Sequence, residues 1–153
     1  MPERKPAAAQ YLDYMLAAAS EYIGRSLAPE LEKRGVPLEC WRVLNLLATG
    51  EGWAMGELAN AGLLSLPTAT RVIDRMVSGA LVYRAPDPED RRRVLIFVSD
   101  KGLRVWADVK KSVDRYQKAI VHQYGDAWIR ELLNKLSTLI DKQNEGYKAK
   151  TPV

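Results

Sequence analysis

The 153-residue sequence contains only one cysteine, Cys40, and only one histidine, His122. A lone cysteine excludes an intramolecular disulfide framework, and the two residues cannot supply a cysteine-based or multi-histidine metal site. They also leave no nucleophile–histidine–acid set to assemble, and the sequence has no glycine-rich phosphate-binding loop. The sequence therefore predicts no metal, no cofactor and no enzymatic activity.

Long hydrophobic runs are missing as well. No segment approaches the run of about 18 apolar residues that a membrane-spanning helix needs. The amino-terminal stretch MPERKPAAAQ has neither a long apolar core nor a signal-peptidase site. We therefore expect a cytoplasmic globular protein, for which 47% hydrophobic and 27% charged residues are ordinary values.

The net charge of +4 is unevenly distributed. Residues 63–111 contain ten basic and six acidic side chains, whereas the rest of the chain contains 13 of each. All of the excess positive charge therefore falls in one third of the sequence. Such clustering is typical of proteins that bind nucleic acid, although a solvated basic surface gives the same pattern.

Hydrophobic periodicity divides the chain into helices and two short strands. The helices are expected at about residues 7–33, 37–49, 54–61, 65–78, 100–124 and 127–147. The strands, rich in β-branched and aromatic residues, are expected at 81–84 and 94–98. The glycines expected to end helices are Gly35, Gly50, Gly62, Gly79 and Gly125.

The middle of the chain predicts a winged helix-turn-helix. Ser65 can cap the helix at 65–78, and Pro67 lies in its first turn, where no N–H is needed. A tight turn separates this helix from the short helix at 54–61, as in a helix-turn-helix. Between the two strands, residues 85–93 combine two prolines, acidic turn residues and three arginines, which indicates a basic-tipped hairpin, or wing.

Long helices with an apolar stripe flank this module. They could fold back on it as a bundle, but their length favours a two-fold dimer with interleaved helices. The predicted fold is mainly α with a small β-wing. We assign residues 1–35 to an amino-terminal dimerisation helix, 36–99 to a DNA-binding winged module and 100–153 to carboxy-terminal dimerisation helices, within one structural domain overall.

Several motifs between Glu57 and Gly102 resemble, in order and spacing, those of the MarR family of bacterial transcription regulators. The wing segment Asp-Pro-Glu-Asp-Arg-Arg is the most specific of them. The matching segments are Glu57-Leu58-Ala59, Thr68–Met76, Gly79–Arg84, Pro86–Arg92, Val94–Ile96 and Ser99–Gly102. The flanking helices match in length and order, so the resemblance covers nearly the whole chain. The departures are Ser99 where threonine is commoner, Met76 where leucine is usual, and Pro67.

This resemblance implies a homodimeric, nucleoid-associated regulator that binds a pseudo-palindromic operator in double-stranded DNA. Repression is the family's commoner mode, and members typically release DNA when a small, often aromatic anion binds between the dimer helices and the winged module. Two other functions stay open: a ligand-independent architectural or protein-binding winged helix, and a cysteine redox sensor. The three wing arginines argue against pure protein binding.

The helix at 65–78 is expected to enter the major groove with its amino-terminal half facing the base edges. Its candidate contacts are Ser65, Thr68, Thr70, Arg71 and Arg75. Arg71 could bind a guanine bidentately or only a phosphate. Thr68 and Thr70 could reach phosphates or thymine methyls, or could simply be exposed. Arg75 fits a phosphate contact or a salt bridge better than a base contact.

The wing is expected to reach the adjacent minor groove, because a narrow A·T-rich groove attracts arginine. In the resemblance, Asp90 pairs with Arg92 and orients it for the groove. Arg91 and Arg93 would add phosphate contacts, which make binding salt-dependent without making it selective. The alternative is a solvated charged turn.

Aromatic and basic residues of the first two helices offer a ligand site. An arginine beside aromatic walls suits a phenolic acid or an aryl carboxylate. The candidates are Tyr11, Tyr14, Tyr22, Arg25, Trp41 and Arg42. Aromatics at helical spacing are more often part of a core or a dimer seam. We expect Cys40 to be a buried, inert thiol and His122 to be a structural or surface residue.

Overall fold

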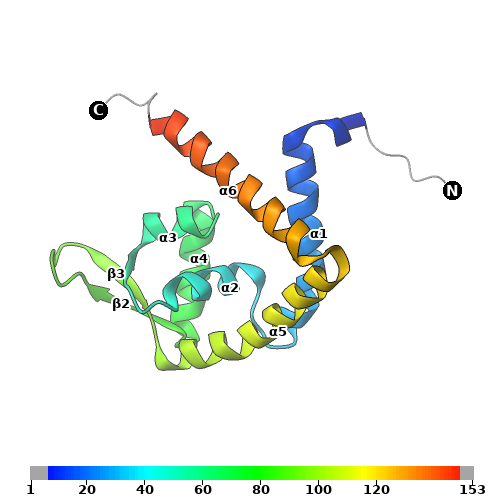
Figure 1. Cartoon of the computed structure of the whole chain (residues 1–153). Coiled ribbons are helices and arrows are strands. Elements are labelled where there is room, and N and C mark those ends of the chain that lie inside the picture. The colour runs from blue at the N-terminus through cyan, green and yellow to red at the C-terminus, as the bar shows by residue number, and fades with distance from the viewer. Residues whose placement is uncertain (1–6, 149–153) are drawn as a thin grey trace. The chain divides into compact units, whose positions relative to one another are not determined.

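The computed structural model describes residues 7–148, and side chains up to residue 142 (Figure 1). Its elements are η1 (Ala7–Gln10), α1 (Leu12–Glu32), α2 (Leu38–Leu47), β1 (Trp53–Ala54), α3 (Met55–Ala61), α4 (Leu66–Ser78), β2 (Val82–Pro86), β3 (Val94–Val98), α5 (Asp100–Tyr124) and α6 (Asp126–Lys148). The chain forms two compact units, Met1–Val113 and Asp114–Val153. Among the described residues, none of the helices has the length and apolarity of a membrane span.

The predicted helices and strands are confirmed, with two differences. The helix expected over residues 7–33 is divided into the 3-10 turn η1 and α1, because Tyr11 between them has an extended backbone (φ −97°, ψ 134°). Strand β1 was not predicted, since two residues are too few to show an alternating pattern. It is defined by pairing with a distant strand instead of by its own sequence.

The three strands form an antiparallel sheet in the order β1-β3-β2. The central strand β3 pairs with β2 from Val82–Val98 to Pro86–Val94. On this hairpin, the rings of Tyr83 and Phe97 stack with their centroids 5.6 Å apart. The β2–β3 hairpin projects from the helices of the first unit, as the green strands of Figure 1 show, and its connecting residues form the wing.

Helix α4 packs into the core of the first unit through one apolar stripe. Its buried residues are Ala69, Val72, Ile73 and Met76, at the spacing that places side chains on one helix face. The same core contains the fully buried side chains of Leu31, Val43, Leu44, Leu47, Leu58 and Ile96. Each such leucine contributes about 1.5–3 kcal/mol by leaving water. The opposite face of α4 is thereby left for solvent or for a partner.

Helices α3 and α4 end in the same way. The expected glycine ends, Gly62 and Gly79, have ordinary helical φ values of −78° and −80°. The left-handed residue is the next one in each case, Leu63 or Ala80, both with φ 56°. A side chain at position 62 would lie 2.9 Å from the carbonyl oxygen of Leu58, so close packing explains that glycine.

The apolar stripes of the two long terminal helices stay largely exposed in the single chain. In α1, only Leu27 and Leu31 are buried. In α6, Ile129 is the one buried hydrophobic residue among those whose side chains are described. The large exposed apolar residues of these helices include Leu12, Met15, Leu16, Ile23, Trp128, Leu132, Leu133 and Ile140.

Candidate nucleic-acid interface

The start of α4 is fixed by a hydroxyl cap. Ser65 has an extended backbone, and its Oγ accepts a hydrogen bond from the Thr68 N–H at 3.3 Å. The same Oγ donates to Thr68 Oγ1 at 2.8 Å. With Pro67 in the first turn, the cap leaves few free backbone N–H groups and sets where the exposed face begins. The predicted capping role of Ser65 is confirmed.

The exposed face of α4 carries Thr70, Arg71, Asp74 and Arg75. Thr70 Oγ1 donates to the carbonyl oxygen of Leu66 at 3.0 Å. Asp74 is paired with Arg84 of β2 at 2.6 Å, a link between helix and hairpin that the sequence did not lead us to expect. Within residues 7–148, the Arg71 guanidinium has no hydrogen bond or ion pair, so its five N–H donors face solvent.

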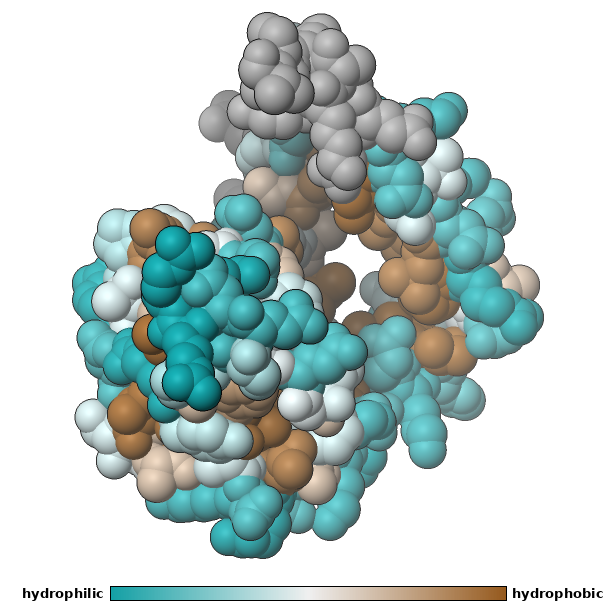
Figure 2. Space-filling model, turned by 90° about the vertical axis from the view of Figure 1, so that its left-hand side faces the viewer, coloured by the Kyte–Doolittle hydropathy of each residue, from teal (hydrophilic) through white to brown (hydrophobic). Residues whose placement is uncertain are grey.

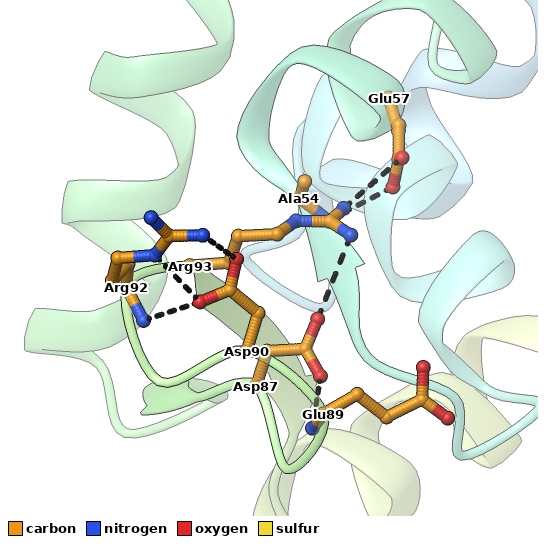
Figure 3. A network of polar contacts seen from close by, with 7 residues as sticks. All are labelled: Ala54, Glu57, Asp87, Glu89, Asp90, Arg92 and Arg93. Carbon is orange, nitrogen blue, oxygen red and sulfur yellow. Dashed lines mark hydrogen bonds and ion pairs between the residues drawn. The ribbon is translucent and has the colours of Figure 1, made fainter.

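The wing contains the predicted pair of Asp90 and Arg92 (Figure 3). Arg92 Nε donates to Asp90 Oδ1 at 3.1 Å, and Arg92 Nη2 donates to Asp90 Oδ2 at 3.2 Å. The backbone N–H of Arg92 also donates to Asp90 Oδ1 at 3.1 Å. The arginine is therefore held in a bidentate fork while its side chain remains 92% exposed.

These hydrogen bonds also act on the carboxyl group of Asp90. The side-chain and backbone hydrogen bonds from Arg92, with the nearby charge of Arg93, hold the pKa of Asp90 below its usual range. All of these donors favour the ionised form. At neutral pH, Asp90 is an acceptor only, which is the state that a guanidinium fork requires.

A second network ties the base of the wing to α3. Arg93 contacts Glu57 (Nη2–Oε1 3.4 Å) and the nearly buried Asp87 (Nη1–Oδ2 3.6 Å). Glu57 also accepts the Ala54 N–H at 3.2 Å, and Asp87 accepts the Glu89 N–H at 2.9 Å. Figure 3 shows Arg93 reaching across to Glu57, while Arg92 lies on the other side of Asp90. Arg93 therefore has partners within the module that the sequence did not lead us to expect.

The carboxy-terminal end of α4 is fastened to the start of α5. Lys101 Nζ donates to the carbonyl oxygen of Gly79 at 2.8 Å. Ser99 Oγ lies 2.7 Å from the carbonyl oxygen of Ala80 and accepts the Gly102 N–H at 2.9 Å. A side chain at Gly102 would lie 2.1 Å from the carbonyl oxygen of Leu81. Close packing of α5 against Leu81 therefore requires a glycine at position 102. The predicted cap at Ser99 is confirmed.

Figure 2 views the protein from the side of the wing, whose hydrophilic surface is teal and faces the viewer. Arg91, Arg92 and Arg93 are all exposed. Arg71 and Arg75 are exposed on α4, in the same compact unit. The structure thus places six of the ten basic residues of segment 63–111 on the hairpin and on α4, and the other four on α5.

The six residues predicted to bind a ligand do not share one environment in the single chain. Trp41 is buried in the core, whereas Tyr22 is 73% exposed on α1. Tyr11 and Tyr14 are exposed as well, and Arg42 is half-buried. Arg25 is exposed and forms an ion pair with Glu21, one turn away on the same helix.

Cys40 lies on α2 and is buried, as predicted. Burial raises the pKa of its thiol, partly offset by the positive charge of Arg75. A protonated, buried thiol reacts slowly with oxidants, because the thiolate is the nucleophile. His122 is exposed near the end of α5.

Comparison with known proteins gives the same assignment as the fold. The MarR family model matches residues 34–93. The chain is 26% identical over 132 residues to the HTH-type transcriptional regulator FarR of Neisseria gonorrhoeae, covering 84% of this chain and 90% of the relative.

Two solved structures have the same fold. One, the transcriptional repressor CouR bound to a 23-mer DNA duplex, matches with a TM-score of 0.79 at 24% identity and covers 90% of this chain and 99% of its own. The other, NadR in complex with 4-hydroxyphenylacetate, matches with a TM-score of 0.74 at 25% identity. The match covers 91% of this chain and 97% of the NadR chain. The ordered motifs, the winged fold and these relatives agree: residues 34–93 match the MarR family of transcription regulators, and the chain as a whole is similar to regulators of that family.

Proposed function

We propose that this protein is a homodimeric, sequence-specific regulator that binds double-stranded DNA. It represses from a pseudo-palindromic operator until a small aromatic or phenolic anion releases it. The observation that carries the proposal is the wing, where Asp90 orients Arg92 and leaves its side chain exposed. An arginine held in this way suits a narrow minor groove, where the negative potential is strongest.

In this proposal α4 lies in the major groove while the wing enters the neighbouring minor groove. Ser65 fixes the start of α4, and Thr68, Thr70 and Arg71 lie on the half that faces the bases. Arg75 and Arg91 contact phosphates. Arg93 holds the wing against α3 through Glu57, and this anchoring role takes the place of the phosphate contact expected from the sequence.

Dimerisation is supported by the uncovered stripes of α1 and α6. Exposed apolar stripes of this kind are rare on a stable monomer and mark an interface. A two-fold dimer also presents two copies of α4, which matches two half-sites about one helical turn of DNA apart. We therefore assign residues 1–35 and 100–153 to the dimer interface, as the sequence predicts.

The proposed ligand class is supported by the aromatic residues of α1, which are exposed in the single chain. A second subunit packed on α1 would enclose Tyr11, Tyr14 and Tyr22 and form aromatic walls beside Arg25. The relative NadR has been solved with 4-hydroxyphenylacetate, a phenolic arylacetate anion. A thermal-shift screen of aromatic acids, followed by a DNA-release assay with each hit, tests this part of the proposal.

The DNA-binding proposal is tested by selecting duplexes from a random-sequence pool with the purified full chain. We expect enrichment of a pseudo-palindrome whose half-site centres are about 10 bp apart. Native mass spectrometry of the complex should give two chains per duplex. A pool that shows no enrichment over input after repeated rounds would overturn the proposal, because an architectural or protein-binding winged helix would not select a sequence.

A further inference from the structure

The exposed face of α4 has fewer polar groups available for base contacts than its sequence suggests. Ser65 Oγ donates its hydrogen to Thr68 Oγ1 at 2.8 Å. Thr70 Oγ1 donates its hydrogen to the carbonyl oxygen of Leu66 at 3.0 Å. A hydroxyl has one hydrogen to donate. Ser65 and Thr70 therefore have no donor left for a base edge.

The other polar side chains at this end of α4 are also partly engaged. Thr68 receives the hydrogen bond from Ser65 and is half-buried. The Asp74 carboxylate is paired with Arg84 at 2.6 Å, so one of the two oxygens that could accept from a cytosine amino group is already engaged. Arg71, like Arg75 one turn further along, has no hydrogen bond or ion pair with a described side chain.

Apolar groups fill the rest of this surface. Leu66 is 54% exposed, and Pro67 is exposed beside it in the first turn of α4. Neither belongs to the buried stripe of the helix, so the core does not explain them. The Thr70 hydroxyl is turned back to the helix backbone, which leaves its methyl group as the part available to a partner.

One base edge in the major groove is apolar. Thymine presents a C5-methyl group there, and none of the other three bases carries a methyl group. On the basis of the proposed function, in which α4 is the helix that enters the major groove, we infer that Leu66 and Pro67, with the methyl of Thr70, recognise thymine methyl groups. Arg71 supplies the charged contact beside them. Specificity at these positions then depends on shape and burial instead of on hydrogen-bond donors.

The inference predicts an effect of a definite size. Burying one methyl group is worth about 0.8 kcal/mol, which corresponds to about a fourfold change in affinity. Replacing thymine with uracil removes the methyl and keeps every Watson–Crick group. At the thymines contacted by α4, this replacement should weaken binding about fourfold, and at the other thymines it should have no effect.

The experiment begins with a duplex recovered by the random-sequence selection. Each thymine is replaced singly by uracil, and affinity is measured by fluorescence anisotropy with the wild-type chain, Leu66→Ala and Val94→Ala. Leu66 and Val94 are equally exposed apolar residues. Val94 lies at the base of the wing, which is proposed to face the minor groove, where thymine shows no methyl group. Thermal unfolding verifies that both variants fold.

We expect a subset of thymines in each half-site to show the fourfold effect with the wild-type chain and with Val94→Ala, and to lose it with Leu66→Ala. Tight binding with no response to uracil at any position would overturn the inference while leaving the proposed function intact. A uracil effect that persists unchanged in Leu66→Ala would also overturn it. Failure to recover any duplex would instead count against the proposed function itself.

Discussion

The Asp90 carboxylate and the Arg92 guanidinium form two parallel hydrogen bonds, of 3.1 and 3.2 Å, across two residues of the wing. A third hydrogen bond, from the Arg92 N–H, joins the same carboxylate to the backbone. An exposed arginine ordinarily samples many rotamers, and ordering it on DNA costs entropy. The Asp90 fork restricts those rotamers in advance, so the pair prepares Arg92 for binding.

Replacement of Asp90 with asparagine should weaken DNA binding several-fold, because asparagine keeps one acceptor for the Arg92 N–H but loses the charged fork. The pKa of Asp90 is lowered in the fold. The ion pair is therefore present above the usual pKa of an aspartate and is lost only as pH falls through the lowered value. Titrations by anisotropy should give the same ratio of wild-type to variant affinity between about pH 5 and pH 8. A ratio that rises steeply across this range would contradict the assignment.

The contact between Arg93 and Glu57 predicts a positioning role for both residues. Glu57→Gln should change the free energy of unfolding by less than about 1 kcal/mol, because the Arg93–Glu57 pair is half exposed. Arg93→Ala should cost more, because it also leaves the nearly buried Asp87 without its counter-charge. Both should weaken DNA binding, since the wing loses its anchor on α3. The double variant should bind no worse than Arg93→Ala alone.

The salt dependence of binding separates this anchor from a phosphate contact. The logarithm of the binding constant falls linearly with the logarithm of the salt concentration. Removal of a phosphate contact makes this slope less negative by about one, whereas loss of the anchor alone leaves the slope unchanged. We expect an unchanged slope for Arg93→Ala. Lys111→Ala removes an equal charge from an exposed pair with Asp108 on α5 and is the matched control. Additive effects of Arg93→Ala and Glu57→Gln would show that the two residues act independently.

The sequence was sufficient to predict the arrangement of the helices, the wing hairpin and the Asp90–Arg92 pair. The helices and the hairpin depend on local signals: periodicity, the Ser65 cap and the prolines of the wing. The Asp90–Arg92 pair was implied by the resemblance of the wing motif to the MarR family. Gly125 was also predicted correctly as the break between α5 and α6, and its φ of +89° shows why a glycine is favoured there.

The contacts between distant segments could not be predicted in this way. Arg93 meets Glu57 across 36 residues of sequence, and Lys101 caps α4 from the next helix. Nothing in the spacing of these residues indicates which exposed charges will meet. The local hydrogen bonds of the Ser65 and Thr70 hydroxyls could not be predicted either. Serine and threonine at the start of such a helix are typical both of base contacts and of hydrogen bonds within the helix.

The surroundings of Gly102 and Gly56 predict opposite effects on stability when each glycine is replaced by alanine. A side chain at position 102 would overlap the carbonyl oxygen of Leu81 at 2.1 Å, so Gly102→Ala should destabilise the protein by about 3 kcal/mol. A methyl group at position 56, in the first turn of α3, would have no atom within 4 Å, so Gly56→Ala should stabilise by about 0.5 kcal/mol. Chemical denaturation of both variants measures the two values. Equal stabilities would contradict the close contact between α5 and Leu81.

The wing arginine is tested most directly by one comparison of affinities. Wild-type chain, Arg92→Ala and Arg130→Ala are titrated against the selected duplex by fluorescence anisotropy at one fixed salt concentration. Arg130 is an exposed arginine of α6, paired with Asp126, and its variant loses the same charge. We predict a loss of affinity of about tenfold or more for Arg92→Ala, little change for Arg130→Ala, and thermal unfolding like that of the wild type for both. An Arg92→Ala protein that binds the duplex as tightly as the wild type would contradict the proposed role of the wing.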